Sequence, residues 1–232
     1  MKHLTYTLAL VLIMLLTMSA PAIAGIVNPG FETGDFTGWT TDGNVAVVTA
    51  GCSTIYPFHC AAPYSGNYMA LLTSGAISIA QLDADLGVMI EAVYPNATYG
   101  SAIWQTVFVN AGTPLSFAVD FLGNDYTPFN DTAILTAFVI ENGSNSTYFL
   151  ADIATVGNYG TTGWVLYNPF GYSTYTGHYT IGFAVFNQVD NALNSQLLVD
   201  SVYFPTPEPG TLVLLGTGVL GLGGLLRRKL NL

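Results

Sequence analysis

Basic residues are missing from the central part of this sequence. Lysine and arginine do not occur between Gly25 and Thr206, a stretch that holds all but one of the fourteen aspartates and glutamates. A chain this acidic repels the phosphates of nucleic acids, so we expect no nucleic-acid partner. It also cannot form ordinary salt bridges there. A buried carboxylate must therefore be satisfied by backbone N–H groups, hydroxyls, its own proton or a metal cation.

Basic side chains do occur at the two ends, where they flank apolar segments: Lys2, Arg227, Arg228 and Lys229. At the N-terminal end, Lys2 precedes a short apolar run over Leu8–Leu16, and Ala22-Ile23-Ala24 places small residues before Gly25. This order is typical of a secretory signal peptide, and the short run disfavours the alternative, a transmembrane anchor. We therefore predict that residues 1–24 are removed.

Cysteine is scarce as well. The only two, Cys52 and Cys60, lie close together in the sequence, and in an exported chain such a pair favours one disulfide. The loop that it closes contributes about 2–3 kcal/mol in the chain-entropy model. The spacing matches none of the usual metal motifs, although a metal or catalytic pair that includes His59 is the competing interpretation.

Motifs of nucleophilic, metal-dependent and phosphate-transfer catalysis are absent. The mature sequence has only His59 and His178 as histidines, and it lacks a Gly-x-Ser-x-Gly elbow, a His-Glu-x-x-His pair and a phosphate-binding loop. Two carboxylates can in principle hydrolyse a glycoside, but so many acids form pairs by chance. We assign no catalytic residue and expect a protein that is not an enzyme.

Helical periodicity is nearly absent between residues 25 and 205, where large apolar residues alternate with small or polar ones. Leu115–Phe121 and Tyr179–Val185 show this alternation, which is typical of strands with one face on a core. We expect one all-β domain over residues 25–205, a β-sandwich of the jelly-roll type. Its strands are predicted near 45–50, 67–73, 76–81, 103–109, 115–121, 132–140, 147–155, 162–167, 179–185 and 196–204.

The C-terminal end combines three unlike features in a fixed order. Pro207-Glu208-Pro209 is followed by the apolar stretch Thr211–Leu226 and then by Arg227-Arg228-Lys229. The stretch predicts a single apolar helix, slightly short for a membrane span and rich in glycine, which permits close packing against another membrane helix. The basic cluster should stay in the cytoplasm, so we expect the domain to lie outside the inner membrane.

This arrangement closely resembles the PEP-CTERM sorting signal of Gram-negative bacteria. The resemblance covers residues 206–232 and implies processing by an exosortase, a membrane protease of the transpeptidase type. It implies a precursor anchored transiently in the inner membrane and a product at the cell surface or in the extracellular matrix. Such proteins often come from bacteria that secrete exopolysaccharide and form biofilm. A plain tail anchor is the alternative.

Three segments of the central domain resemble galactose-binding-like jelly rolls, the group that includes many carbohydrate-binding modules. Residues 28–39 resemble the first strand of such domains, residues 65–71 the short glycine-centred strand that follows, and residues 197–202 the closing strand with its aspartate. The resemblance implies a domain that binds carbohydrate, with exopolysaccharide as the expected ligand.

Asp200 is the most informative single residue of the closing strand. It alternates in phase with Leu198, Val202 and Phe204, so we expect a buried carboxylate in a domain without a basic partner. Either a metal cation satisfies it, or backbone N–H groups or solvent do.

In jelly rolls of this type, an aspartate of the last strand and a glutamate just after the first strand share a structural Ca²⁺. Glu32 and Asp200 match those positions. The resemblance therefore implies a calcium site at these two residues, and backbone carbonyls near Asn28 and Gly66 would complete its shell of oxygen ligands.

Aromatic residues are densest in one predicted loop, Asn168–Tyr175. Sugar rings often stack on aromatic side chains, so Tyr172 and Tyr175 are our candidates for a carbohydrate surface. We expect an exported, non-enzymatic protein of the cell surface or extracellular matrix. The alternatives are a secreted carbohydrate-active hydrolase, or its accessory module, that uses acidic residues, and a purely structural matrix component.

Overall fold

The computed structural model describes residues 25–203, with the backbone alone over residues 168–172. The predicted signal peptide, the motif Pro207-Glu208-Pro209 and the apolar helix predicted after it lie outside the described residues. Within residues 25–203, we find no helix that combines the length and the apolar character needed to span a bilayer.

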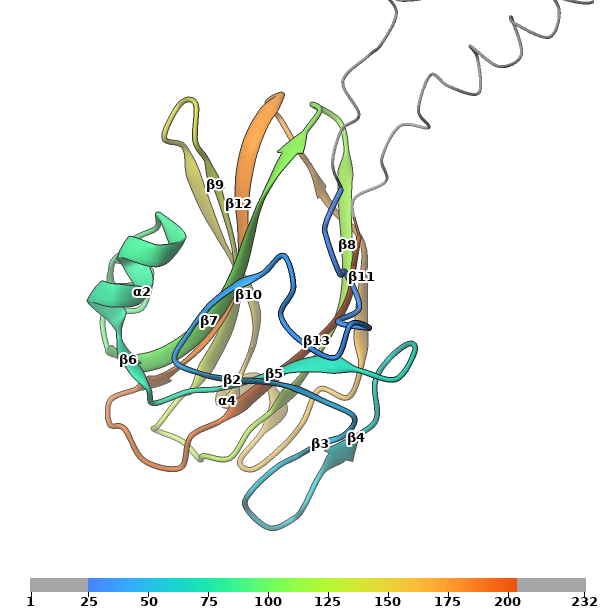
Figure 1. The fold of residues 1–232 in the computed structure, drawn as a ribbon. Coiled ribbons are helices and arrows are strands. Elements are labelled where there is room, and N and C mark those ends of the chain that lie inside the picture. Colours follow the sequence, from blue (N-terminus) through green and yellow to red (C-terminus); the bar gives the residue numbers. More distant parts are fainter. Residues whose placement is uncertain (1–24, 204–232) are drawn as a thin grey trace, which may run out of the picture. The chain divides into compact units, whose positions relative to one another are not determined.

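The described chain forms two antiparallel sheets that face each other (Figure 1). The first sheet has the order β1 (Thr40–Asp42), β7 (Ala97–Val109), β12 (Gly177–Gln188), β9 (Thr132–Val139), β10 (Asn145–Asp152), and β6 (Ile77–Ser78) pairs with β7. The second sheet has the order β11 (Val165–Tyr172), β8 (Pro114–Leu122), β13 (Gln196–Tyr203), β5 (Met69–Thr73), β2 (Asn44–Val48). From β7 onward, every connection except β9–β10 crosses between the sheets, as in jelly rolls. The predicted all-β sandwich is confirmed.

A third, two-stranded sheet consists of β3 (Gly51–Cys52) and β4 (Cys60–Ala61). Cys52 and Cys60 form the predicted disulfide across it, and we call residues 51–61 the disulfide hairpin. The hairpin packs on the outer face of the second sheet, because a Cβ on Gly51 would come within 2.5 Å of Leu198 Cδ2. A small buried cluster lies at this contact: Met69, Leu122 and Leu198.

The main core lies between the sheets and is built from alternate residues of the long strands. Phe117 of β8 meets Phe183 of β12 edge to face, with ring centroids 5.2 Å apart. Both side chains are fully buried, and burying a side chain of this size contributes about 1.5–3 kcal/mol. The alternation predicted over 115–121 and 179–185 therefore identifies core residues correctly.

Helix α2 (Ile79–Leu86) covers the outer face of the first sheet (Figure 1), where we predicted a strand over 76–81. Its buried side chains are spaced by three and four residues: Ile79, Leu82 and Leu86. Ser78 accepts a hydrogen bond from the first turn and Gly87 ends the helix with a φ of 66°. The prediction holds for β6 at Ile77–Ser78 and is wrong from Ile79 onward. Two helical turns are too short to stand out against the strand signals around them.

The helix packs on outward-facing residues of the first sheet: Ala102, Ile134, Ala184 and Phe186. Gly182 is needed at this contact, because a Cβ there would lie 2.4 Å from Leu86 Cδ2. Two shorter helices, α3 (Ile90–Val93) and α4 (Ile153–Val156), complete the described structure. A capping box between Asp152 and Thr155 begins α4, so the strand predicted over 147–155 ends earlier, at Asp152.

Residues 28–39 form a series of turns, so the first strand predicted for this segment is absent. Asn28 and Phe31 have φ values of 50° and 58°, whereas a strand requires extended backbone throughout. The Phe31 ring is fully buried and lies against Trp39, with ring centroids 5.4 Å apart. These aromatic contacts hold the turns on the main core.

Candidate functional site

Glu32 and Asp200 come from opposite ends of the described chain and meet at one turn. Glu32 belongs to the N-terminal turns and Asp200 to β13. Asp200 Oδ2 accepts a hydrogen bond from the Ser65 N–H at 2.9 Å, and Glu32 Oε1 accepts one from the Asn67 N–H at 2.9 Å. The two carboxylates selected from the sequence therefore flank the turn that precedes β5.

A bulge in β13 determines where Asp200 points. Ser201 has a φ of 53°, and the register with β8 shifts after Asp200. Val202 consequently joins Val199 in the main core, while Leu198 belongs to the cluster under the disulfide hairpin. The predicted alternation of Asp200 with Val202 is wrong for this reason. Asp200 is nevertheless fully buried, as expected.

Glu32 is exposed and held by backbone donors. Its Oε1 also accepts a hydrogen bond from the Tyr68 N–H at 3.0 Å, and its Oε2 accepts one from the Asn67 N–H at 3.1 Å. The N–H groups of Tyr68 and Asn67 lower the pKa of Glu32. Glu32 is therefore an ionised carboxylate at neutral pH.

Asp200 shows the opposite tendency. Burial raises the pKa of Asp200, the N–H groups of Ser65 and Ser201 offset part of the rise, and the negative charge of Glu32 adds to it. A cation between the two carboxylates would counter both the burial and the repulsion.

A hollow of about 310 Å³ separates the two carboxylates, with this lining: Pro29, Gly30, Glu32, Ser65, Asp200, Ser201 and Tyr203. A Cβ on Gly66 would lie 2.3 Å from Glu32 Oε1, and one on Gly30 would lie 3.3 Å from Asp200 Oδ1. Glycine thus lets the backbone approach both carboxylates closely. The space and the hard oxygen atoms fit a cation such as Ca²⁺.

The backbone carbonyls predicted as further ligands differ in availability. The Asn28 carbonyl oxygen already accepts hydrogen bonds from the Phe31 N–H at 3.2 Å and from Trp39 Nε1–H at 3.1 Å. Both of its lone pairs are occupied, and those of Glu32 Oε1 are engaged in the same way by the N–H groups of Asn67 and Tyr68. Gly66 lies directly beside Glu32. Among residues 25–203, no three His, Cys, Asp or Glu side chains form a metal-binding group. A cation here would need backbone and water oxygens in addition to the two carboxylates.

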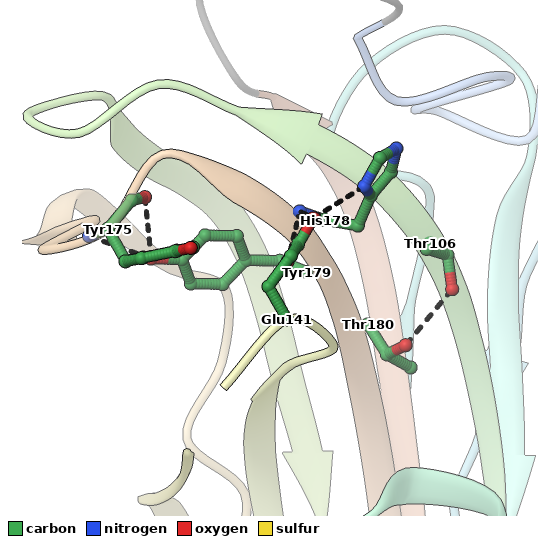
Figure 2. A network of polar contacts seen from close by, with 6 residues as sticks. All are labelled: Thr106, Glu141, Tyr175, His178, Tyr179 and Thr180. Atoms are coloured by element: carbon green, nitrogen blue, oxygen red, sulfur yellow. Dashed lines mark hydrogen bonds and ion pairs between the residues drawn. The ribbon is translucent and has the colours of Figure 1, made fainter. Parts of the chain in front are cut away.

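The segment predicted as an aromatic loop, Asn168–Tyr175, is mostly strand. Residues up to Tyr172 belong to β11, which pairs with β8, and the side chain of Tyr172 lies outside the described part. Tyr175 is 39% exposed. Its N–H donates to Tyr179 Oη at 3.1 Å, and its carbonyl accepts from that hydroxyl at 2.9 Å (Figure 2). Tyr175 therefore has a fixed backbone and an accessible ring.

Beside this turn, Glu141 and His178 form a surface pair (Figure 2). His178 Nδ1 lies 2.7 Å from Glu141 Oε1, and the His178 N–H donates to both carboxylate oxygens at 2.9 Å. The His178 side chain lowers the pKa of Glu141. The pair ties the start of β12 to the turn after β9, which is a structural role.

The disulfide hairpin carries the most exposed aromatic residues of the described chain, and our sequence reading did not select them. Tyr56 is 79% exposed and Phe58 is 67% exposed, and their rings meet edge to face with centroids 6.2 Å apart. We call these two residues the aromatic tip. A signal was present in the sequence, because a loop this short between two cysteines has no core in which to bury aromatic rings.

Several contacts fix the hairpin in place. Ser53 Oγ accepts a hydrogen bond from the His59 N–H at 2.8 Å, and the Thr54 N–H donates to Asn124 Oδ1 at 3.0 Å. Just after the hairpin, Trp164 Nε1–H donates to the Ala62 carbonyl at 2.8 Å. A contact surface ordered in advance loses less conformational entropy on binding.

Comparison with known families decides the nature of the tail. Residues 205–229 match the PEP-CTERM protein-sorting motif. This is an exported protein with a C-terminal sorting signal. The match confirms the resemblance drawn from Pro207-Glu208-Pro209 and the basic residues up to Lys229, and the motif implies processing by an exosortase.

Several solved structures with a similar fold are carbohydrate-binding modules. TmCBM61, solved in complex with β-1,4-galactotriose, is 16% identical with a TM-score of 0.43, covering 79% of this chain and 99% of that one. The CBM22-1 xylan-binding domain of Paenibacillus barcinonensis Xyn10C is 13% identical with a TM-score of 0.39, covering 81% and 97%. CBM28, specific for non-crystalline cellulose, is 13% identical with a TM-score of 0.41, covering 78% and 96%. No curated protein matches the chain.

Proposed function

We propose that residues 25–205 are a non-enzymatic polysaccharide-binding domain, with exopolysaccharide as its ligand. The aromatic tip carries this proposal. Tyr56 and Phe58 present apolar rings to solvent on a stapled hairpin, which is typical of a contact surface. Stacking of sugar rings on aromatic faces requires no positive charge, so it suits a domain without lysine or arginine.

The place of action follows from the two ends of the chain. The predicted signal peptide directs residues 25 onward across the inner membrane of a Gram-negative bacterium. The apolar helix within residues 206–232 then holds the precursor in that membrane until an exosortase processes the tail. The domain is released to the cell surface or the extracellular matrix. The match to the sorting motif supports this sequence of events.

Calcium is the proposed structural cofactor of the domain. Glu32 and Asp200 would hold it at the turn that precedes β5, together with backbone oxygens near Gly66. Bound there, Ca²⁺ would neutralise two neighbouring carboxylates and fasten the N-terminal turns to β13. The hollow between the carboxylates and the close approach of glycine backbone support this assignment.

Affinity electrophoresis of the full chain, in gels that contain the exopolysaccharide of the producing bacterium, tests the function. We expect the polysaccharide to retard the chain, and we expect no new reducing ends after prolonged incubation. Retardation with release of reducing ends would assign the chain to the hydrolases instead. Absence of both would leave a purely structural matrix component and would contradict the proposal.

A further inference from the structure

A second pair of aromatic residues lies at the base of the disulfide hairpin. Tyr64 follows the hairpin in the sequence, and Trp164 directly precedes β11. Their ring centroids are 5.8 Å apart, with an angle of 62° between the ring planes, and Tyr64 is 43% exposed. We call these two residues the aromatic base. Neither belongs to the aromatic tip or lines the hollow between Glu32 and Asp200.

The aromatic base is held in a fixed orientation. Trp164 Nε1–H donates a hydrogen bond to the Ala62 carbonyl at 2.8 Å, and the indole packs on the small buried cluster under the hairpin. The indole therefore has one side on the second sheet, and Tyr64 lies against it with a large part of its ring in solvent. A surface that is ordered in this way loses little conformational entropy when a ligand binds.

The aromatic base and the aromatic tip lie on the same side of the domain. The disulfide hairpin covers the outer face of the second sheet, and Trp164 packs on the same buried cluster as Ala61 of the hairpin. Tyr64 follows Phe58 by six residues, which span at most about 22 Å when fully extended. Both aromatic groups are therefore within reach of one polysaccharide chain.

The two segments that carry these groups are nearly free of charge. Residues 51–64 and 161–166 contain no aspartate, glutamate, lysine or arginine, and His59 is their only basic side chain. The rest of the domain carries acids without lysine or arginine. A polyanion would therefore meet a negative field and find no lysine or arginine to hold its carboxylate or sulfate groups. An uncharged polymer meets no such repulsion.

We propose that the aromatic base is a second sugar subsite, and that tip and base together bind an internal stretch of one uncharged exopolysaccharide chain. The second subsite rests on the proposed function, and it adds the charge class of the ligand and the path of its chain. Sugar faces would stack on the rings, and the hydroxyls of Tyr56 and Tyr64 can both donate to and accept from sugar hydroxyls. Because both subsites act on one chain, a long polymer gains an effective concentration that a short oligosaccharide lacks.

Affinity electrophoresis of the full chain tests the second subsite. The gels contain the exopolysaccharide of the producing bacterium, separated by anion exchange into a neutral and an acidic fraction. We expect the neutral fraction to retard the wild type and the acidic fraction to leave it unretarded. Tyr64→Ala should bind the neutral fraction about three- to tenfold more weakly. Tyr99→Ala, which removes a ring of matched exposure (44%) from β7 of the first sheet, is the control and should bind as the wild type does.

The dependence of affinity on chain length separates binding from packing. Oligosaccharides of known size, prepared by partial hydrolysis of the neutral exopolysaccharide, compete with the polymer for the chain. In the wild type, fragments long enough to reach both groups should compete about tenfold better, or more, than the shortest fragments. This ratio should fall in Tyr64→Ala. A residue that only packs against Trp164 would change the Tm and leave the ratio as it is.

Wild-type affinity with an unchanged length dependence in Tyr64→Ala would overturn the second subsite, while binding by the aromatic tip would stand. Retardation by the acidic fraction that equals or exceeds that by the neutral one would overturn the charge class. If Tyr64→Ala does not fold, as judged by circular dichroism, Tyr64→Leu keeps an apolar contact with Trp164 and takes its place, with the same loss expected. Absence of retardation of the wild type by either fraction would instead contradict the proposed function itself.

Discussion

The outer faces of the two sheets are covered in different ways. On the first sheet, α2 buries leucine and isoleucine side chains against apolar residues of the strands. On the second sheet, the disulfide hairpin covers a face with a small apolar cluster, and two buried carboxylates, Asp120 and Asp200, belong to strands of the same sheet. One cover depends on hydrophobic contact, and the other depends on a covalent bond and polar contacts.

Asp120 shows how the second face is stabilised without lysine or arginine. Its Oδ1 accepts a hydrogen bond from Thr161 Oγ1 at 2.7 Å. Burial raises the pKa of Asp120, while the hydroxyls of Thr161 and Thr162 and the positive charge of His59 lower it. Hydroxyls and the hairpin thus replace a salt bridge. Because the disulfide holds the hairpin in place, the aromatic tip does not have to pack against the sheet and is available for contact.

The largest effect on stability should come from the apolar cover. Leu82→Ala removes a fully buried side chain of α2 and should reduce the free energy of unfolding by about 2–5 kcal/mol. Urea unfolding measures this loss. Polysaccharide retention should stay unchanged, since the aromatic tip lies on the other sheet; a loss of retention in a folded variant would contradict the separation of roles.

Removing the staple should have a smaller effect on stability and a larger one on binding. Cys52→Ser combined with Cys60→Ser frees the hairpin, which should lower the free energy of unfolding by about 2–3 kcal/mol. The same variant should bind polysaccharide more weakly, because the tip loses its fixed orientation. Unchanged affinity in this variant would show that the staple does not serve the tip.

Calcium removal tests the polar contacts on the second face. EGTA should lower the Tm of the wild type by about 2–4 °C for each kcal/mol of binding free energy lost. The fall should be smaller in Asp200→Asn, which lacks one proposed ligand. Differential scanning calorimetry compares the two proteins. A wild-type Tm that does not change on adding EGTA would contradict the proposed calcium site.

The smallest effect should come from the surface pair at Glu141. Its pKa lies below the ordinary 4.5 because of His178, so the pair stabilises the fold above the ordinary value and loses this effect as the pH falls through the lowered one. Glu141→Gln should therefore be slightly less stable than the wild type at neutral pH and equal to it in strong acid. Urea midpoints at the two pH values check this convergence.

Much of the sandwich was predictable because large apolar residues alternate with small or polar ones along strands such as β8 and β12. The strands around Phe117 and Phe183 were predicted close to their observed bounds, and the disulfide followed from the short spacing of two cysteines. Helix α2 was missed because its two turns carry only three buried residues. The turns at 28–39 were mistaken for a strand because the resemblance to jelly rolls outweighed the turn signal of Asn28. The positive φ of Phe31 has no signature in its residue type.

The candidate site was likewise predictable only in part. Glu32 and Asp200 were found through a resemblance, and the structure shows the turn at Ser65 that they flank. The bulge at Ser201 was not predictable, because the positive φ of this residue does not change the order of residue types along the predicted strand.

Binding by the aromatic tip is the central claim, and one comparison of variants tests it most directly. Tyr56→Ala with Phe58→Ala removes both exposed rings, and Tyr99→Ala removes a ring that is 44% exposed at another place. Affinity electrophoresis with exopolysaccharide should show about a tenfold or greater loss of affinity for the double variant and wild-type affinity for Tyr99→Ala. Wild-type affinity in the folded double variant would contradict the account.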